Sequence, residues 1–176
     1  MTWWLLNPGT GDTTSSVELS LGTSAPTDAD PANYDTNRDT GPGLRIRKGP
    51  DGLDTTDSNR VQVWTVTQPT GRSVDGSVQL FLWAATRNFN PAKSATLAAA
   101  LERCTGGVCT RMATDEVTFA GASSWVALTF DFGPMAQTWA PGEEVVVRIA
   151  APSTSGDHPW IGYDSVATPA RLVVGA

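Results

Sequence analysis

The chain has 176 residues, of which 40% are hydrophobic and 17% are charged, and its formal net charge is −6. This length and composition fit one globular domain with a sizeable core and exclude a disordered tail. The negative charge argues against a nucleic-acid partner, because phosphate contacts need clustered Lys and Arg. No membrane partner is expected either, because no apolar run approaches the roughly 18 residues that a spanning helix needs.

Residues 1–16 are expected to form an N-terminal arm. Its only apolar run, Trp3 to Leu6, is shorter than the roughly 7–15 residues of the apolar region of a secretory signal. If the natural chain starts at Met1, we expect synthesis in the cytoplasm without export by the usual route. Adjacent strand residues point to opposite faces, so one of Trp3 and Trp4 is expected in the core and the other against a neighbouring subunit.

A long acidic loop is expected at residues 26–43, after a half-buried strand at residues 17–21. Oxygen donors recur at every second residue of this loop, and a glycine follows that allows a sharp turn. Calcium takes six to eight oxygen ligands, and this spacing can wrap one ion. The alternative is a loop whose carboxylates cap its own backbone amides. The candidate ligands of a structural calcium ion are Asp35, Asn37, Asp39 and Asp164, with Asp51, Asp54 or Asp57 as further donors.

From residue 44 onward, short alternating segments bounded by turn residues predict strands. Residues 96–104 are ambiguous, because the run Ala98 to Ala100 favours helix, whereas Pro91 upstream and a turn downstream favour strand. A series of short strands without a convincing helix predicts an all-β fold, a two-sheet antiparallel sandwich of jelly-roll type, with an up-and-down barrel as the lesser alternative. The expected strands are 44–48, 61–67, 77–86, 96–104, 108–112, 116–119, 125–132, 145–150, 160–163 and 172–174.

The two cysteines, Cys104 and Cys109, bracket the turn sequence Thr-Gly-Gly-Val. Such a turn can bring their Cα atoms close enough for a disulfide, which we predict in preference to free thiols. A loop this short would add only roughly 2 kcal/mol in the chain-entropy model. A zinc site is not expected, because it would need two more ligands and the single histidine, His158, is distant in sequence.

Seven tryptophans are many for this length. Trp64, Trp83 and Trp125 lie on expected strands and are predicted to pack in the core or between the sheets. The other tryptophans flank turns or termini, where exposed rings can stack on sugars or anchor a protein interface. These candidate partner-binding residues are Trp3, Trp4, Trp139 and Trp160.

Few residues suggest catalysis, and we expect a protein that is not an enzyme. His158 lies in a turn, and the sequence contains no G-x-S-x-G nucleophile elbow. Paired carboxylates for glycoside hydrolysis stay open as an alternative, because Glu116, Glu143 and Glu144 are present. No expected strand presents two acids on one cleft face.

Several short motifs together resemble a known kind of module. They are Tyr34-Asp35-x-Asn37-x-Asp39-x-x-Pro42-Gly43, a Trp-containing strand pair, a Cys-x4-Cys hairpin and a closing Tyr163-Asp164 strand. In this order they resemble a β-sandwich module of actinobacterial surface proteins and of virion proteins from phages that infect those bacteria. The resemblance implies a display or structural role and brings no catalytic residue with it.

Three hypotheses of function follow. The first is a non-enzymatic structural protein of a phage virion, a capsid decoration or minor tail protein that attaches in many copies to a larger assembly. Cytoplasmic synthesis and a disulfide fit a protein that is released by lysis. The second is a secreted carbohydrate-binding or adhesive cell-surface module with structural calcium and glycan ligands. The third is a small glycan-active enzyme with two carboxylates.

Overall fold

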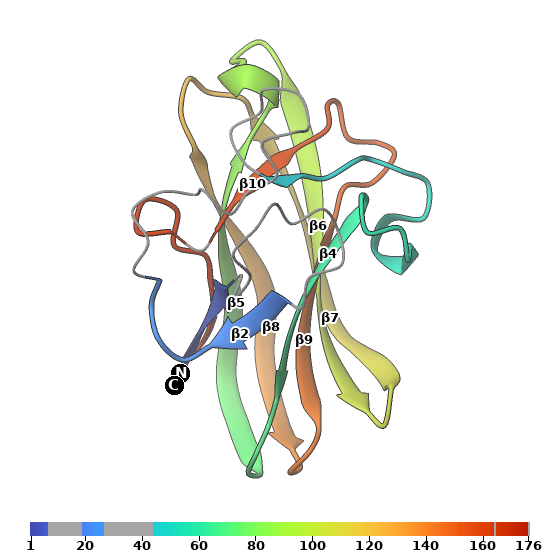
Figure 1. Ribbon diagram of the computed structural model, residues 1–176, viewed down its shortest axis with the longest axis vertical. Helices are drawn as coiled ribbons and strands as arrows, with labels where there is room; N and C mark the ends of the chain where they lie inside the picture. Colours follow the sequence, from blue (N-terminus) through green and yellow to red (C-terminus); the bar gives the residue numbers. More distant parts are fainter. Residues whose placement is uncertain (7–18, 27–43, 164, 176) are drawn as a thin grey trace.

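The computed structural model describes residues 1–6, 19–26, 44–163 and 165–175 (Figure 1). Within these residues the chain forms strands and two three-residue 3-10 turns, η1 (Gly52–Asp54) and η2 (Arg87–Phe89). None of the described residues forms a helix long and apolar enough to cross a membrane. The strands are β1 (Thr2–Leu6), β2 (Leu19–Gly22), β3 (Leu44–Arg45), β4 (Val61–Thr67), β5 (Arg72–Ala85), β6 (Ser94–Thr105), β7 (Val108–Ala120), β8 (Val126–Trp139), β9 (Glu144–Ala150), β10 (Trp160–Gly162) and β11 (Arg171–Val174).

The strands form two antiparallel sheets that face each other, so the expected all-β sandwich of jelly-roll type is confirmed. Hydrogen bonding runs in the order β3-β10-β5-β11-β1-β2-β4-β9-β6-β7, and β8 pairs with β5. The short parallel contact of β2 with β4 joins the two sheets along one side. We call the sheet that contains β5 the first sheet and the one that contains β6 the second sheet. The two ends of the chain lie side by side (Figure 1), and the Met1 nitrogen donates to the Val174 carbonyl at 2.6 Å.

Strand alternation explains how the two sheets enclose one core. Along β5, Val78, Leu80 and Leu82 are buried, whereas the intervening residues are half-buried or exposed. In the second sheet, the side chains of Leu97 and Leu101 on β6 belong to the same buried cluster. Burying these apolar faces against each other removes them from water, which drives the assembly of the sandwich.

The outer face of the second sheet is covered, which resolves the ambiguous alanine run. Residues 94–105 form strand β6, as predicted, and η1 packs against β6 and β9. Ala98 and Ala100 point outward from the core, yet they are buried. We infer that alanine is suited to these positions because a small side chain lets the loop of η1 approach the sheet closely, a tertiary requirement that overrides helix propensity.

Several predicted boundaries were wrong. Within the expected N-terminal arm 1–16, residues 2–6 form β1 between β11 and β2. The predicted strands 108–112 and 116–119 are one strand, β7, because β6 pairs with it along its whole length across a bulge at Leu101 and Glu102. The predicted strand 125–132 extends to Trp139, because β5 also begins earlier, at Arg72, and pairs with that extension.

The facing edges of β7 and β8 are joined by a side chain. Asp115 on β7 accepts a hydrogen bond from the Asp131 backbone N–H on β8, with an Oδ2–N distance of 2.7 Å. The other oxygen of Asp115 accepts from the Glu116 backbone N–H at 2.8 Å. An inward-turned carboxylate of this kind blunts a strand edge that could otherwise pair with another chain.

Candidate functional site

A row of aromatic and arginine side chains crosses the outer face of the first sheet. Trp4 on β1 is in register with Arg171 on β11, and Arg171 is in register with Phe81 on β5. The Arg171 guanidinium carbon lies 5.5 Å from the ring centroid of Trp4 and 4.8 Å from that of Phe81. Both distances are within cation–π range, so Arg171 fixes the two rings on either side of it.

Trp83 extends this row along β5. It lies two residues after Phe81 and therefore points to the same outer face, since Leu80 and Leu82 point into the core. We call Trp4, Phe81, Trp83 and Arg171 the outer aromatic cluster. All of its members are half-buried, so part of each side chain reaches solvent.

Polar groups lie directly beside the outer aromatic cluster. On β8, Thr129 is in register with Phe81, and Asp131 is in register with Gln79. Thr129 and Asp131 are exposed, and Gln79 is half-buried. Apolar ring surface flanked by hydroxyl, carboxylate and amide groups is the composition of a site that packs on an apolar face and hydrogen-bonds polar groups at its rim.

Which tryptophans are buried and which reach the surface differs in part from the prediction. Trp3 and Trp4 are confirmed to lie on opposite faces, with Trp3 only 1% exposed. The prediction that Trp139 and Trp160 offer partner-binding surface was wrong, because each is also 1% exposed. Trp64 lies in the core as expected, 5.1 Å edge-on from the Tyr163 ring. Trp83 was expected to be buried and is half-buried.

Trp125 was likewise expected in the core and is half-buried. Its ring meets that of Phe89 edge-on, with centroids 5.6 Å apart. Phe89 belongs to η2, and its φ of 50° and that of Asn88, 54°, lie in the left-handed region. Trp125 therefore packs on an unusual backbone turn and makes no part of the outer aromatic cluster.

A second feature is a small pocket of about 220 Å³ lined by Arg45, Arg87, Asp157, His158 and Trp160. Trp160 on β10 is in register with Arg45 on β3 and with Ala85 on β5. Its indole Nε1 is buried and has no hydrogen-bond partner in the described part of the chain. A buried N–H without an acceptor is unfavourable, and the indole Nε1 atoms of Trp64 and Trp139 are buried in the same way.

His158 is held by the backbone around the pocket. Its Nδ1 accepts a hydrogen bond from the Lys48 backbone N–H at 3.0 Å, so the neutral ring carries its proton on Nε2. Desolvation and the nearby charge of Arg45 lower the pKa of His158, and they outweigh the opposing effect of Asp157. The ring is therefore neutral at pH 7.

Asp157 is the acidic member of the pocket and is fully engaged. One oxygen accepts from the His158 backbone N–H at 2.9 Å, and the other lies 3.0 Å from Lys93 Nζ. Desolvation raises the pKa of Asp157, but the hydrogen bonds from Lys93 and from the His158 and Arg87 backbone N–H groups outweigh it and lower the pKa overall. Asp157 thus organises the pocket wall as a paired carboxylate.

The predicted calcium ligands cannot be placed. Asp35, Asn37, Asp39 and Asp164 all lie outside the described residues. The described residues contain no group of three or more His, Cys, Asp or Glu side chains that could hold a metal ion. The further donors serve other contacts, because Asp54 pairs with Arg111 at 2.8 Å, and Asp51 and Asp57 both pair with Arg60.

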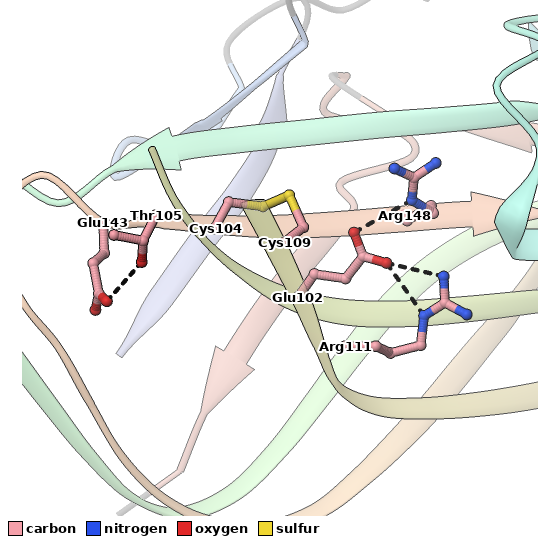
Figure 2. Close-up of a disulfide and its surroundings, with 7 residues drawn as sticks. All are labelled: Glu102, Cys104, Thr105, Cys109, Arg111, Glu143 and Arg148. Atoms are coloured by element: carbon pink, nitrogen blue, oxygen red, sulfur yellow. Dashed lines mark hydrogen bonds and ion pairs between the residues drawn. A yellow bond between two sulfur atoms is a disulfide. The ribbon is translucent and has the colours of Figure 1, made fainter. Parts of the chain in front are cut away.

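The acids considered for catalysis also serve structural roles where contacts are described. Figure 2 shows Glu143 beside Thr105, whose hydroxyl donates to its Oε1 at 2.9 Å. The other Glu143 oxygen accepts from the Ala140 backbone N–H at 2.7 Å, which stabilises the turn before β9. Glu116 is exposed on β7 and Glu144 is half-buried at the start of β9. Glu116 and Glu144 therefore lie on different strands.

The disulfide between Cys104 and Cys109 is present and closes the β6–β7 hairpin, as predicted (Figure 2). The two residues are directly in register, and their Cα atoms are 4.0 Å apart. Gly106 and Gly107 form the turn, and both have positive φ, at 57° and 82°. Glycine adopts this conformation without the steric cost that a side chain would bring.

No protein-family model and no curated protein sequence matches the chain. Among solved structures, an aminopeptidase from the marine sediment archaeon Thaumarchaeota archaeon matches 99% of this chain at 13% identity and a TM-score of 0.65, with 36% of that chain covered. A CocE/NonD family hydrolase from Staphylococcus aureus matches 99% of this chain at 10% identity and a TM-score of 0.64, again with 36% of that chain covered. A CBM35 from Cellvibrio japonicus Abf62 is less similar, with a TM-score of 0.40 and 17% identity over 100% of this chain and 95% of that one.

These similarities concern the fold. The chain spans only 36% of the length of the aminopeptidase and of the CocE/NonD hydrolase. At identities of 13% and 10%, residues of the outer aromatic cluster cannot be carried over from either protein. The function therefore has to be argued from the site itself.

Sequence reasoning located parts of the outer aromatic cluster but did not assemble it. The alternation of β5 places Phe81 and Trp83 on one face. Because Trp3 and Trp4 are adjacent in a strand, one of their rings was already expected to point outward. No sequence pattern around Arg171 marked it as part of the cluster. It lies 167 positions after Trp4 in the sequence, and only the pairing of β1 with β11 brings the two together.

Proposed function

We propose that this chain is a non-catalytic binding module that recognises carbohydrate through the outer aromatic cluster. The observation that carries the proposal is the cross-strand row in which Arg171 lies between the rings of Trp4 and Phe81. A sugar ring has an apolar face that packs on aromatic rings and hydroxyl groups around its edge that need hydrogen-bond partners. The outer aromatic cluster and its polar neighbours offer both.

The rigidity of the platform supports this proposal. Trp4, Arg171 and Phe81 are on three neighbouring hydrogen-bonded strands, so their spacing is set by the sheet and not by a loop. Little conformational entropy is lost when a ligand packs on side chains that are already held in place. Binding sites on regular elements are also more accurately positioned than sites on loops.

A non-catalytic role is supported by the way the acidic side chains are used. Glu102, Glu143 and Asp115 each accept hydrogen bonds from the protein's own groups. Hydrolysis of a glycosidic bond by two carboxylates needs one of them free to protonate the glycosidic oxygen and the other free on the opposite side of the scissile bond, to attack the sugar carbon or activate a water. Among the described residues, Asp131 lies beside the outer aromatic cluster, and its Oδ1 already accepts from the Gly133 backbone N–H at 2.9 Å.

Affinity electrophoresis in gels that contain neutral or acidic polysaccharides tests the proposal. We expect retardation by at least one polysaccharide, and about a tenfold loss of affinity in Phe81→Ala and in Trp83→Ala, since truncating a central aromatic contact typically costs more than 1 kcal/mol. Trp125→Ala is the matched control, because Trp125 is also half-buried but lies outside the cluster. Equal losses in all three variants, retardation by no polysaccharide, or release of reducing sugar by the pure protein would refute the proposal.

The virion role stays a prediction from the sequence. It rested on the motif resemblance and on cytoplasmic synthesis with a disulfide, and residues 1–16 were expected to attach the protein; residues 7–16 lie outside the described part of the chain. Its attachment residues are reduced to Trp4, since Trp3 is buried in the core. A virion protein would be captured by purified particles or capsid shells, whereas a carbohydrate-binding module would be captured by cell-wall or capsular polysaccharide.

A further inference from the structure

We infer that the carbohydrate bound by the outer aromatic cluster is acidic, and that Arg171 binds its carboxylate, as in a uronic acid. The inference rests on the proposed function and names the class of ligand. A neutral sugar needs ring surface and partners for its hydroxyl groups, whereas a uronic acid also needs a cation among them. Arg171 is the cation of the cluster, and it lies between the rings of Trp4 and Phe81.

The charge of Arg171 is not neutralised by the residues that the structure describes. Arg171 contacts the rings of Trp4 and Phe81, and it makes no ion pair or hydrogen bond with the described part of the chain. A cation–π contact holds the charge against the face of a ring and uses no oxygen acceptor. The five N–H groups of the guanidinium are therefore left for water or for a ligand.

The guanidinium of Arg171 can be reached from solvent. Because Arg171 makes no hydrogen bond with the described residues, any buried nitrogen of its side chain would be a buried atom without a partner. None of its nitrogens is in this state, unlike the indole Nε1 of Trp160. The nitrogens of this half-buried residue thus keep accessible surface. A guanidinium is also weakly hydrated, so it loses little when it pairs with an anion.

The two rings beside Arg171 favour a planar anion that belongs to a sugar. Phe81 is 4.8 Å and Trp4 is 5.5 Å from the guanidinium carbon, so a ligand approaches on the side that the rings leave open. Arginine binds a carboxylate through two parallel hydrogen bonds in one plane. A uronic acid that packs on either ring carries its carboxylate at the edge of the sugar, next to the guanidinium.

Asp131 is an acidic side chain beside the cluster, and its charge would repel an anion bound close to it. Asp131 is in register with Gln79, whereas Arg171 is in register with Phe81, so Asp131 and Arg171 are two strands and one row of side chains apart. At the usual spacings of a sheet this is about 12 Å, which exceeds the Debye length of about 8 Å at physiological salt. A ligand can therefore place its carboxylate at Arg171 and donate from its hydroxyl groups to Asp131.

Matched polysaccharides test the inference, with hyaluronan, polygalacturonate and alginate as the acidic probes. Chemical reduction of their carboxyl groups gives neutral polymers with the same linkages. Isothermal titration calorimetry compares each pair. We expect at least one acidic polymer to bind about tenfold more tightly than its reduced form, since hydrogen bonds between charged groups are the strong ones. Dextran sulfate tests whether a tetrahedral anion is preferred to a carboxylate.

The preference for the acidic form should depend on Arg171. Arg171→Gln should remove the preference, and a general loss from looser rings cancels because both forms pack on the same rings. Arg72→Gln is the matched control and should keep the preference. Arg72 is also half-buried and lies 6.0 Å from the Trp3 ring. It comes two residues before the buried Val74 and so points away from the cluster.

Four results would overturn the inference. They are equal or weaker binding of every acidic polymer relative to its reduced form, an unchanged preference in Arg171→Gln, an equal loss in Arg72→Gln, and tighter binding of dextran sulfate than of every uronate. Binding of neutral polymers only, with a loss in Phe81→Ala, would overturn this inference and leave carbohydrate recognition in place. Binding of no polysaccharide would overturn both.

Discussion

Glu102 on β6 and Arg111 on β7 are in register across the two paired strands and form a charged pair. Oε1 of Glu102 lies 3.0 Å from Nη2 and 3.2 Å from Nε of Arg111. The other carboxylate oxygen lies 3.4 Å from Nε of Arg148 on β9, so one buried carboxylate is shared by two arginines (Figure 2). Arg111 also pairs with Asp54 at 2.8 Å, and Arg148 donates to the Thr55 carbonyl at 3.4 Å. The network fastens the loop of η1 to the outer face of the second sheet.

Removing the charge of Glu102 should destabilise the protein. The Glu102 side chain is 5% exposed, so Glu102→Gln leaves two arginines without their carboxylate and should cost about 2–3 kcal/mol of unfolding free energy. Glu116→Gln is the control, because Glu116 is exposed on the next strand, and a change within about 0.5 kcal/mol is expected there. Urea unfolding measures both. Similar values for the two variants would show that the network does not stabilise the fold.

The disulfide should add a modest stability that a reductant abolishes. In the chain-entropy model, a loop as short as that between Cys104 and Cys109 stabilises by about 2 kcal/mol. The double variant Cys104→Ala/Cys109→Ala should lose this amount in urea unfolding, and dithiothreitol should shift the midpoint of the wild type but not that of the variant. A reductant effect in the variant as well would contradict this explanation.

Gly121 should tolerate no side chain. A Cβ at this position would overlap the Asn90 carbonyl oxygen and the Thr86 hydroxyl, and the Gly121 N–H also donates to the Lys93 carbonyl at 2.8 Å. Gly121→Ala should therefore cost about 1–3 kcal/mol through overpacking. At Gly71 a Cβ would make ordinary contacts of 3.6 Å, so Gly71→Ala should change the midpoint little. Thermal unfolding of the two variants compares them, and equal melting temperatures would be inconsistent with this packing.

Stability should fall as the pH drops below 6.5, the ordinary pKa of histidine, because of His158. Desolvation and the Arg45 charge lower its pKa in the folded state. The unfolded chain thus binds a proton first, so the contribution of the neutral ring is fully present above pH 6.5 and is lost as the pH falls toward the folded pKa. His158→Asn keeps an acceptor for the Lys48 N–H and should lack this component. Urea unfolding between pH 7.5 and 5.0 tests the difference, and an identical pH dependence in both proteins would exclude His158 as its source.

The fold class could be predicted from the sequence because it depends on local alternation and turn residues. The strand at 61–67 and the Cys104–Cys109 hairpin were found for this reason, since each is encoded within a few residues. Whether a tryptophan is buried depends instead on contacts between residues that are distant in sequence. Trp160 belongs to a three-residue strand whose neighbours, β3 and β5, come from distant parts of the chain.

The candidate site, too, could be predicted only where it depends on residues close together in sequence. Phe81 and Trp83 could be placed on one strand face from their spacing, but their partners could not be named. The contact of Arg171 with Trp4 requires the two ends of the chain to pair, and a local sequence pattern does not show which distant strands are neighbours in the sheet. The pocket likewise gathers Arg45, Arg87 and His158 from three separate segments.

The most direct measurement for the proposed function is a titration of ¹⁵N-indole-labelled protein with a panel of neutral and acidic oligosaccharides. Binding at the outer aromatic cluster should shift the indole signals of Trp4 and Trp83, while those of the buried Trp3, Trp64 and Trp139 stay in place. The Trp83 response should need about tenfold more ligand in Phe81→Ala than in the wild type. Shifts that leave Trp4 and Trp83 unaffected with every oligosaccharide would contradict carbohydrate recognition by this face of the sheet.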